Sequence, residues 1–149
     1  MSNAYSVVIP AYNAAETIEE ALRSILTQNI PPERIAVVDD GSTDDTGTRA
    51  AAMDSRVTVI RQENQGPGAA TNTGLATVVS PLVAFLDADD LWLPRKTERQ
   101  LAILGERKKV AAVFTQAQVF KGPSDAPVLG AVTDLWSRTT LMMRTEVAR

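Results

Sequence analysis

The sequence predicts an α/β fold in which a mostly parallel sheet carries helices on both faces. Short, almost wholly apolar runs of strand length alternate along the chain with segments whose apolar residues recur at helical spacing. Strands that are buried on both faces read as continuous apolar runs, and strict strand–helix alternation is typical of parallel sheets. Such folds bind ligands at the carboxyl ends of their strands, so a functional site is expected there.

The first strand and helix are predicted from the opening residues. Residues 5–10 (YSVVIP) form a β-branched apolar run closed by proline, which indicates a strand. Apolar side chains at positions 18, 22, 25 and 26 then follow a helical period. Asn13 and Glu16 have the spacing of a capping box, and Pro31 and Pro32 end the segment.

The second unit has the same order. Residues 34–39 (RIAVVD) predict a buried strand, and a turn and a short helix to about Ala52 follow it. Gly41 permits the sharp turn, Ser42 is a good N-cap, and Asp45 stands at the capping-box position.

The remaining elements are predicted in order along the chain. A third strand covers 57–61 (VTVIR), the loop ENQGPG follows, and a helix covers 70–78. A fourth strand covers 81–87 (PLVAFLD), and Pro94 opens a helix that reaches about Arg107. A fifth strand is expected over 110–119. The tail from Lys121 is loop-like, and residues 141–149 (LMMRTEVAR) start one more strand or helix.

Composition limits the chemistry that the chain can perform. With 149 residues, 44% of them hydrophobic, residues 1–149 are expected to form a single domain. The chain has no cysteine and no histidine, which excludes thiolate nucleophiles, zinc–cysteine sites and a histidine base. Any chemistry must use carboxylates, hydroxyls, amides, lysine and arginine.

Charge and hydropathy bear on the partners. The net charge is −3 and no basic run occurs, so nucleic acid is not an expected partner. No stretch has the length and apolar character of a transmembrane segment, and the N-terminus lacks the features of a secretory signal. We therefore expect a soluble, cytoplasmic protein, and leave open membrane attachment through a region outside this chain.

Aspartates gather directly after two of the predicted strands. Seven of the ten aspartates lie in three clusters, at positions 39–40, 44–45 and 87–90. In a parallel sheet the first and third clusters share one edge, where their carboxylates repel unless a cation lies among them. Loop solvation or capping explains any one pair alone, and we assign Asp44 and Asp45 to it. For the other two clusters together, a Mg²⁺ or Mn²⁺ site is the better interpretation.

Two further features could belong to the same site. Asp39 ends a buried strand and therefore needs a partner, such as the imide N–H of a pyrimidine base. The loop Asn64-Gln65-Gly66-Pro67-Gly68 could let backbone approach a phosphate closely, although an ordinary loop leading into a helix explains it equally well.

Four ordered blocks give the chain its resemblance to a known family. They are VVIPAYNAAETIEEALRSILTQ, RIAVVDDGSTDDT, NQGPGAATNTGLA and FLDADDLWLPRK. In this order and at these intervals they resemble the N-terminal half of the family 2 nucleotide-sugar glycosyltransferases, which have the Rossmann-like GT-A fold. The resemblance covers residues 5–120. It implies inverting, metal-dependent transfer of a sugar from a nucleoside diphosphate sugar, expected to be a UDP-sugar, to an unknown acceptor.

The resemblance also implies roles for residues of the first two blocks. Ala11 and Tyr12, with Pro10 beside them, would form part of the nucleotide base pocket. Asp39 would accept a hydrogen bond from the base. Gly41 and Ser42 would shape the same wall.

The DADD block has its own implied roles. Asp87 and Asp89, with Ala88 between them, match the family's DxD element. Asp87 would lie at the ribose and the metal, and Asp89 would bind the Mn²⁺ or Mg²⁺ that bridges the diphosphate. Asp90 would lie behind them.

Two departures from the family pattern matter. The block that commonly reads ARN is ATN here, so Thr71 replaces an arginine that often helps to hold the donor, while Asn72 is kept. The chain also stops before the glycine-rich region and the acidic pair that supply the general base. We expect a truncated transferase domain whose catalytic base lies beyond residue 149. The alternative is a base from the tail: Asp125, Asp134 or Glu146.

Proteins of other function classes share some of these sequence features. A non-catalytic nucleotide-binding or interaction module that kept the donor half would have the same motifs. A signalling receiver fits less well because the third strand, VTVIR, ends without an aspartate, and a dehydrogenase would need G-x-G-x-x-G after the first strand. Nucleotidyltransferases usually carry a basic, glycine-rich first loop, which is missing here. A core face exposed by truncation would favour a homodimer.

Overall fold

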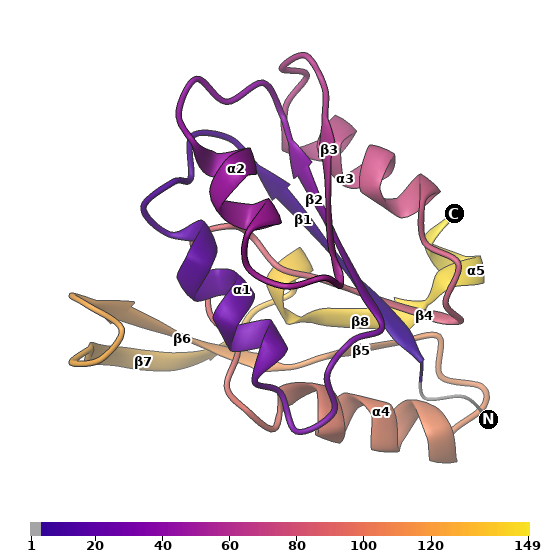
Figure 1. The fold of residues 1–149 in the computed structure, drawn as a ribbon. Coiled ribbons are helices and arrows are strands. Elements are labelled where there is room, and N and C mark those ends of the chain that lie inside the picture. The colour runs from indigo at the N-terminus through magenta and orange to yellow at the C-terminus, as the bar shows by residue number, and fades with distance from the viewer. Residues whose placement is uncertain (1–3) are drawn as a thin grey trace.

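The computed structural model describes residues 4–149, and its centre is a six-stranded sheet with strand order β3-β2-β1-β4-β8-β5 (Figure 1). Strand β8 (Leu141–Arg144) is antiparallel to both of its neighbours, β4 and β5 (Ala112–Phe114). Four strands run parallel to one another: β1 (Tyr5–Ala11), β2 (Arg34–Asp39), β3 (Val57–Arg61) and β4 (Leu82–Phe85). The predicted α/β fold with a mainly parallel sheet is confirmed.

Helices cover both faces of this sheet (Figure 1). One face carries α1 (Ile18–Leu26), α2 (Thr46–Ala51) and α4 (Lys96–Glu106), and the other carries α3 (Pro67–Ala76) and α5 (Thr145–Ala148). Alternate residues of a strand point to opposite faces, so a strand covered on both sides must be apolar throughout. In β1, Val7 and Ile9 belong to the larger core cluster and Val8 to the smaller one. All three side chains are fully buried.

The predicted helix caps are wrong, and the residues involved join two loops instead. Helix α1 follows Thr17, and Asn13 adopts a φ of 49° outside the helix. The Asn13 side-chain oxygen accepts a hydrogen bond from the Thr43 amide at 2.8 Å, while the Asn13 amide donates to Ser42 Oγ at 3.0 Å. Helix α2 begins only at Thr46, so Ser42 does not cap it and Asp45 is not in a capping box. The loops after β1 and β2 therefore hold each other in place.

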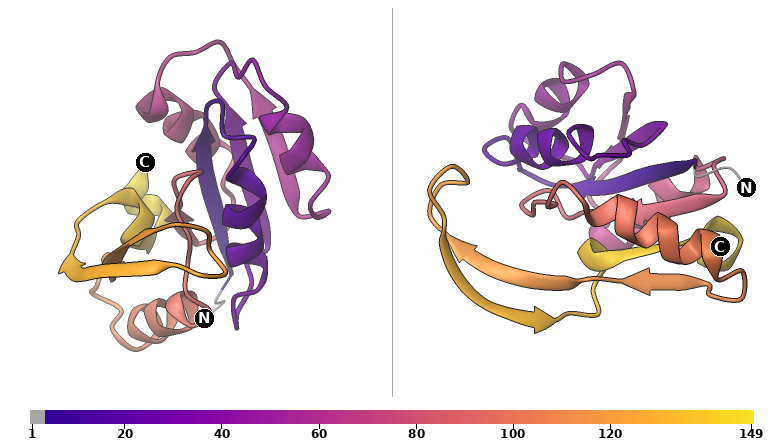
Figure 2. Two further views of the ribbon diagram at one scale, coloured as in Figure 1. Left: turned by 90° about the vertical axis from the view of Figure 1, so that its left-hand side faces the viewer. Right: turned by 90° about the horizontal axis from the view of Figure 1, so that it is seen from below.

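The prediction of a single fifth strand is also wrong. Residues 110–119 do not form one strand: β5 ends at Phe114, where its pairing with β8 ends, and β6 (Gln116–Lys121) follows. The tail is not loop-like, because β6 pairs with β7 (Val128–Asp134) in a hairpin that extends beyond the main sheet (Figure 2). The expectation of a strand or helix near the end of the chain is confirmed twice, by β8 and by α5.

One further element lies between the hairpin and the last strand. A 3₁₀ turn, η1 (Arg138–Thr140), leads into β8. Because β8 runs antiparallel to β4, this turn lies at the carboxyl end of β4, the edge where the site is expected. None of the helices within residues 4–149 has the length and apolar character needed to cross a membrane.

The close approach of α3 to the sheet gives a test of this packing. A Cβ at Gly74 would overlap Val8 and lie 3.1 Å from Val38 Cγ2. We expect Gly74→Ala to lower the free energy of unfolding by about 1–3 kcal/mol, since well-packed cores tolerate added volume poorly. Urea denaturation measures this.

Gly68→Ala, in the same helix, is the matched control. A Cβ at Gly68 meets no atom within 4 Å, so this variant should be neutral or slightly more stable. Equal stability of the two variants would contradict the packing described.

Candidate functional site

A cleft of about 540 Å³ opens at the carboxyl edge of the sheet. The segments after β1, β2 and β4, the start of α3 and the turn η1 all contribute to it. Its lining carries four carboxylates, one guanidinium and the exposed ring of Tyr12. The lining residues are Pro10, Tyr12, Asn13, Ala14, Glu16, Thr17, Asp44, Pro67, Asp87, Ala88, Asp89 and Arg138.

The three aspartates of the DADD block differ in their surroundings. Asp87 Oδ1 accepts a hydrogen bond from Arg138 Nη2 at 3.0 Å, which makes an ion pair whose side chains are both 35% exposed. Asp90 is partly buried and accepts from Thr139 Oγ1 at 2.6 Å. The side chain of Asp89 is exposed and has no hydrogen-bond or ion-pair partner within residues 4–149. Of these three carboxylates, that of Asp89 is therefore the most open to a ligand from solution.

Burial and neighbouring negative charge raise the pKa of one aspartate of this block, Asp90. Burial raises the pKa of Asp90 most, and the neighbouring charges of Asp89 and Asp87 raise it further, against the hydrogen bond from Thr139. Like charge therefore acts within the DADD block, whereas the expected convergence of Asp39 and Asp40 on this block is wrong, because neither residue lines the cleft.

Arg138 and Thr139 contact the DADD block, which the sequence analysis did not predict. Besides its bond to Asp90, Thr139 Oγ1 accepts from the Asp87 amide at 3.2 Å, and the Thr139 carbonyl accepts from Trp92 Nε1 at 3.1 Å. The turn η1 therefore packs against the DADD loop and is joined to it by hydrogen bonds. Residues 138–140 reach this position because β8 pairs antiparallel with β4, which brings them to the carboxyl end of β4. Had that pairing been predicted, it would have placed Arg138 and Thr139 beside the DADD block.

Asp39 has partners inside the chain. Its side chain is 1% exposed, with Oδ1 accepting from the Ser42 amide at 2.9 Å and Oδ2 accepting from Arg61 Nη1 at 2.8 Å. Arg61 Nη2 also donates to the Ser42 carbonyl at 2.8 Å, and its side chain is 64% exposed. The partners that the sequence required for this carboxylate are supplied here by Arg61 and the Ser42 amide.

Asp40 organises the loop before α3. It is buried and accepts hydrogen bonds from the amides of Gln65 and Gly66 and from Gln62 Nε2. Burial raises its pKa, but these three hydrogen bonds together outweigh burial and lower the pKa below its usual value. The residues ahead of α3 are therefore fixed to the end of β2 through one carboxylate.

The structure brings together only some of the predicted nucleotide-binding residues. Four of the nine line the cleft, namely Pro10, Tyr12, Asp87 and Ala88, and so does Asp89, which was predicted as a metal ligand. The other five lie outside its lining: Ala11, Asp39, Gly41, Ser42 and Asn72. Of these, Ala11, Asp39 and Ser42 are buried beneath the loops, Gly41 adopts a φ of 79°, and Asn72 is exposed on α3.

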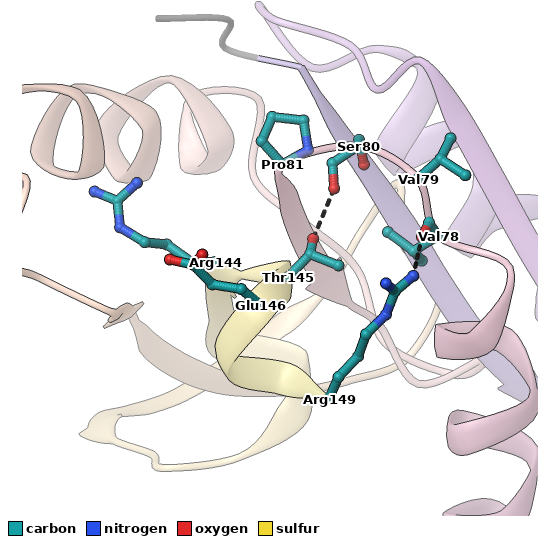
Figure 3. Close-up of a pocket in the computed structure, with 8 residues that line it drawn as sticks. All are labelled: Val78, Val79, Ser80, Pro81, Arg144, Thr145, Glu146 and Arg149. Atoms are coloured by element: carbon teal, nitrogen blue, oxygen red, sulfur yellow. Dashed lines mark hydrogen bonds between the residues drawn. The ribbon is translucent and has the colours of Figure 1, made fainter.

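None of the tail carboxylates lies at the cleft. Asp125 is exposed between β6 and β7, and Asp134 accepts from Gln116 at the end of the hairpin. Glu146 lines a different pocket, which lies beside the start of β4 and the end of β8 (Figure 3). In that pocket Thr145 Oγ1 donates to the Ser80 carbonyl at 2.8 Å, so it is at the opposite edge of the sheet from the DADD block. The carboxylates that do line the cleft, besides Asp87 and Asp89, are Glu16 and Asp44, which the sequence analysis did not place there.

The donor set fits a hard divalent cation only in part. Within residues 4–149 no group of three or more acidic side chains is arranged to hold a metal ion alone. Mg²⁺ and Mn²⁺ are commonly held by one or two carboxylates together with substrate phosphates and water. The exposed carboxylate of Asp89 beside that of Asp87 matches this incomplete kind of site.

The sequence profile described as Glycosyl transferase family 2 matches residues 6–145. The chain belongs to this family. One relative is the succinoglycan biosynthesis protein ExoU of Rhizobium meliloti, which is 43% identical over 100 residues, 64% of this chain and 29% of ExoU. The chain spans 17% to 42% of the lengths of curated relatives of this kind.

Solved structures agree with the family. TarS of S. aureus in complex with UDP-GlcNAc has a TM-score of 0.76 at 27% identity, with 97% of this chain and 46% of that chain covered. The mannosyltransferase PcManGT of Pyrobaculum calidifontis, in complex with GDP-Man and Mn²⁺, has a TM-score of 0.67 at 31% identity, covering 74% of this chain and 34% of its own. This family 2 chain therefore has the GT-A fold.

The buried side chain of Lys96 contacts two residues, Trp92 and Gln100, that bind the turn η1. Lys96 is 9% exposed, its ammonium lies 4.1 Å from the centre of the Trp92 ring, and it donates to Gln100 Oε1 at 2.8 Å. Trp92 and Gln100 in turn donate to the carbonyls of Thr139 and Thr140. Burial lowers the pKa of Lys96 to about 7.

This pKa predicts how stability depends on pH. The unfolded chain keeps the Lys96 proton up to about pH 10.4, so between pH 7 and pH 10 it binds more protons than the folded chain. The free energy of unfolding of the wild type, relative to Lys96→Met, should therefore rise by about 2 kcal/mol from pH 7 to pH 9. Chemical denaturation at each pH measures this difference, and parallel pH profiles would show that Lys96 stays charged in the fold.

Proposed function

We propose that the cleft binds a nucleoside diphosphate sugar together with a divalent cation, and that the sugar is transferred from this donor to an acceptor. The observation that carries the proposal is the position of Asp87 and Asp89 in one cleft with the exposed ring of Tyr12. Membership of family 2 and the similarity to TarS bound to UDP-GlcNAc support a nucleotide-sugar donor.

The base is proposed to lie between Tyr12 and the end of β2. An exposed aromatic ring offers a stacking surface to a base, and Tyr12 is 53% exposed. Asp39 would accept from the base after Arg61 releases its Oδ2 atom, with Gly41 and Ser42 shaping the wall. Arg61 is mostly exposed, so this release costs little packing. We propose uridine as the nucleoside, because the imide N–H of uracil can donate a hydrogen bond to a carboxylate.

Asp89 and Asp87, the DxD pair, are proposed to hold the cation. When bound, Mn²⁺ or Mg²⁺ would neutralise negative charge on the departing nucleoside diphosphate. The complex of PcManGT with Mn²⁺ supports a divalent cation in this fold. Asp90 stays behind the pair, held by Thr139, and keeps the loop in its conformation.

Transfer itself is proposed to invert the anomeric carbon, as the family resemblance implies, and the acceptor is unknown. An inverting reaction needs a base to accept the proton of the acceptor hydroxyl. Asp125, Asp134 and Glu146 all lie outside the cleft, which favours a second candidate for residues 1–149 by themselves: donor binding without transfer. Glycosyl transfer by this chain to an added acceptor would reject that candidate.

Calorimetric titration of UDP with and without Mn²⁺ tests the donor site. We expect UDP to bind in the presence of Mn²⁺, and Asp89→Asn to weaken that binding by about tenfold or more, because a charged ligand is lost from the cation. Asp125→Asn, an exposed aspartate in the hairpin turn, is the matched control and should bind as the wild type does. GDP and dTDP serve as competitors.

Two results would contradict the proposal. Binding of UDP that is the same with Mn²⁺, without it and in Asp89→Asn would show that no cation acts at this site. If none of UDP, GDP and dTDP bound to the protein, the cleft would not hold a nucleotide-sugar donor.

A further inference from the structure

Arg138 lines the cleft, but the donor site proposed above assigns it no role. Its guanidinium donates from Nη2 to Asp87 Oδ1 at 3.0 Å, and from Nη1 to Thr71 Oγ1 at 2.6 Å and to the Pro67 carbonyl at 3.1 Å. It thus joins the end of β4 to the start of α3. Its side chain is 35% exposed and lines the cleft beside Asp87 and Asp89.

The lining of the cleft carries more negative than positive charge. Four carboxylates line it, and Arg138 is the one cationic side chain in the lining contributed by residues 4–149. A nucleoside diphosphate adds further negative charge to the same space. A divalent cation offsets only part of this negative charge, so a protein cation near the phosphates would favour binding of the diphosphate.

The guanidinium is suited to that task. Arginine is always protonated and presents its N–H donors in a planar fork that matches phosphate oxygens. Thr71 also matters, because its short side chain leaves room above α3 and its hydroxyl accepts from Arg138. A longer cationic side chain at position 71 would occupy the same space and repel Arg138.

We propose that Arg138 is a donor-binding residue whose guanidinium contacts the diphosphate of the nucleotide, from the position held against Thr71. This inference rests on the proposed function. On donor binding, Arg138 exchanges its bond to Asp87 for bonds to phosphate oxygens and leaves Asp87 to the divalent cation. Arg138 therefore favours binding of the diphosphate but opposes binding of the cation alone.

The test compares three ligands on matched variants. UDP in the presence of Mn²⁺ and Mn²⁺ alone are titrated by calorimetry, and uridine binding is followed by NMR. The variants are Arg138→Met and Arg56→Met. Arg56 is the control because it is 33% exposed and paired with Asp54 at 2.8 Å, similar to Arg138, but lies at the opposite edge of the sheet, before β3.

The expected pattern separates contact with phosphate from support of the fold. Arg138→Met should weaken UDP by about tenfold or more, leave uridine within about threefold, and leave Mn²⁺ alone unchanged or tighter. Arg56→Met should leave all three unchanged. The double variant Thr71→Arg with Arg138→Thr, which offers the guanidinium from α3 instead, should recover most of the affinity for UDP.

Several results would overturn the inference. Unchanged UDP affinity in Arg138→Met would show that the guanidinium does not contact the diphosphate. An equal loss for UDP, uridine and Mn²⁺, with no recovery in the double variant, would assign Arg138 a purely structural role. Absence of UDP binding in the wild type would instead reject the proposed function itself, and this inference with it.

Discussion

Repulsion between carboxylates at the end of β4 is the constraint on which the site depends. Asp87, Asp89 and Asp90 follow a fully buried strand, and burial first, then the charges of Asp89 and Asp87, raise the pKa of Asp90. The fold tolerates them by giving each a different environment. Asp87 has an arginine, Asp90 has a threonine hydroxyl, and Asp89 has solvent. The cation proposed for the cleft would complete this balance.

The scaffold keeps these groups at one edge through contacts between its loops. Asn13 and Ser42 join the loops after β1 and β2, Asp40 fixes the residues before α3, and Thr139 joins η1 to the DADD loop. Each of these contacts uses a polar side chain that would be costly to bury without a partner. The loops of the cleft are therefore positioned by hydrogen bonds, whereas the strands beneath them are positioned by apolar packing.

The sequence was sufficient for features that depend on local pattern. Continuous apolar strands predicted the parallel part of the sheet, and the DADD block at the end of one of them predicted where the acidic cleft would lie. Features that depend on pairing between distant residues were not predicted. The hairpin of β6 and β7 and the position of Arg138 beside Asp87 both follow from pairings between distant segments, and a strand-length pattern alone does not show its partner. The predicted caps failed for a related reason, because Asn13 and Ser42 satisfy each other across 29 residues.

The most direct test of the account is the position of a manganese ion. Crystals of the chain grown with UDP and Mn²⁺ would be measured by anomalous diffraction at the manganese absorption edge. We expect an anomalous peak between the carboxylates of Asp87 and Asp89 and the diphosphate, with Arg138 turned from Asp87 toward the phosphate oxygens. A manganese peak away from both aspartates, or UDP bound outside the cleft, would contradict it.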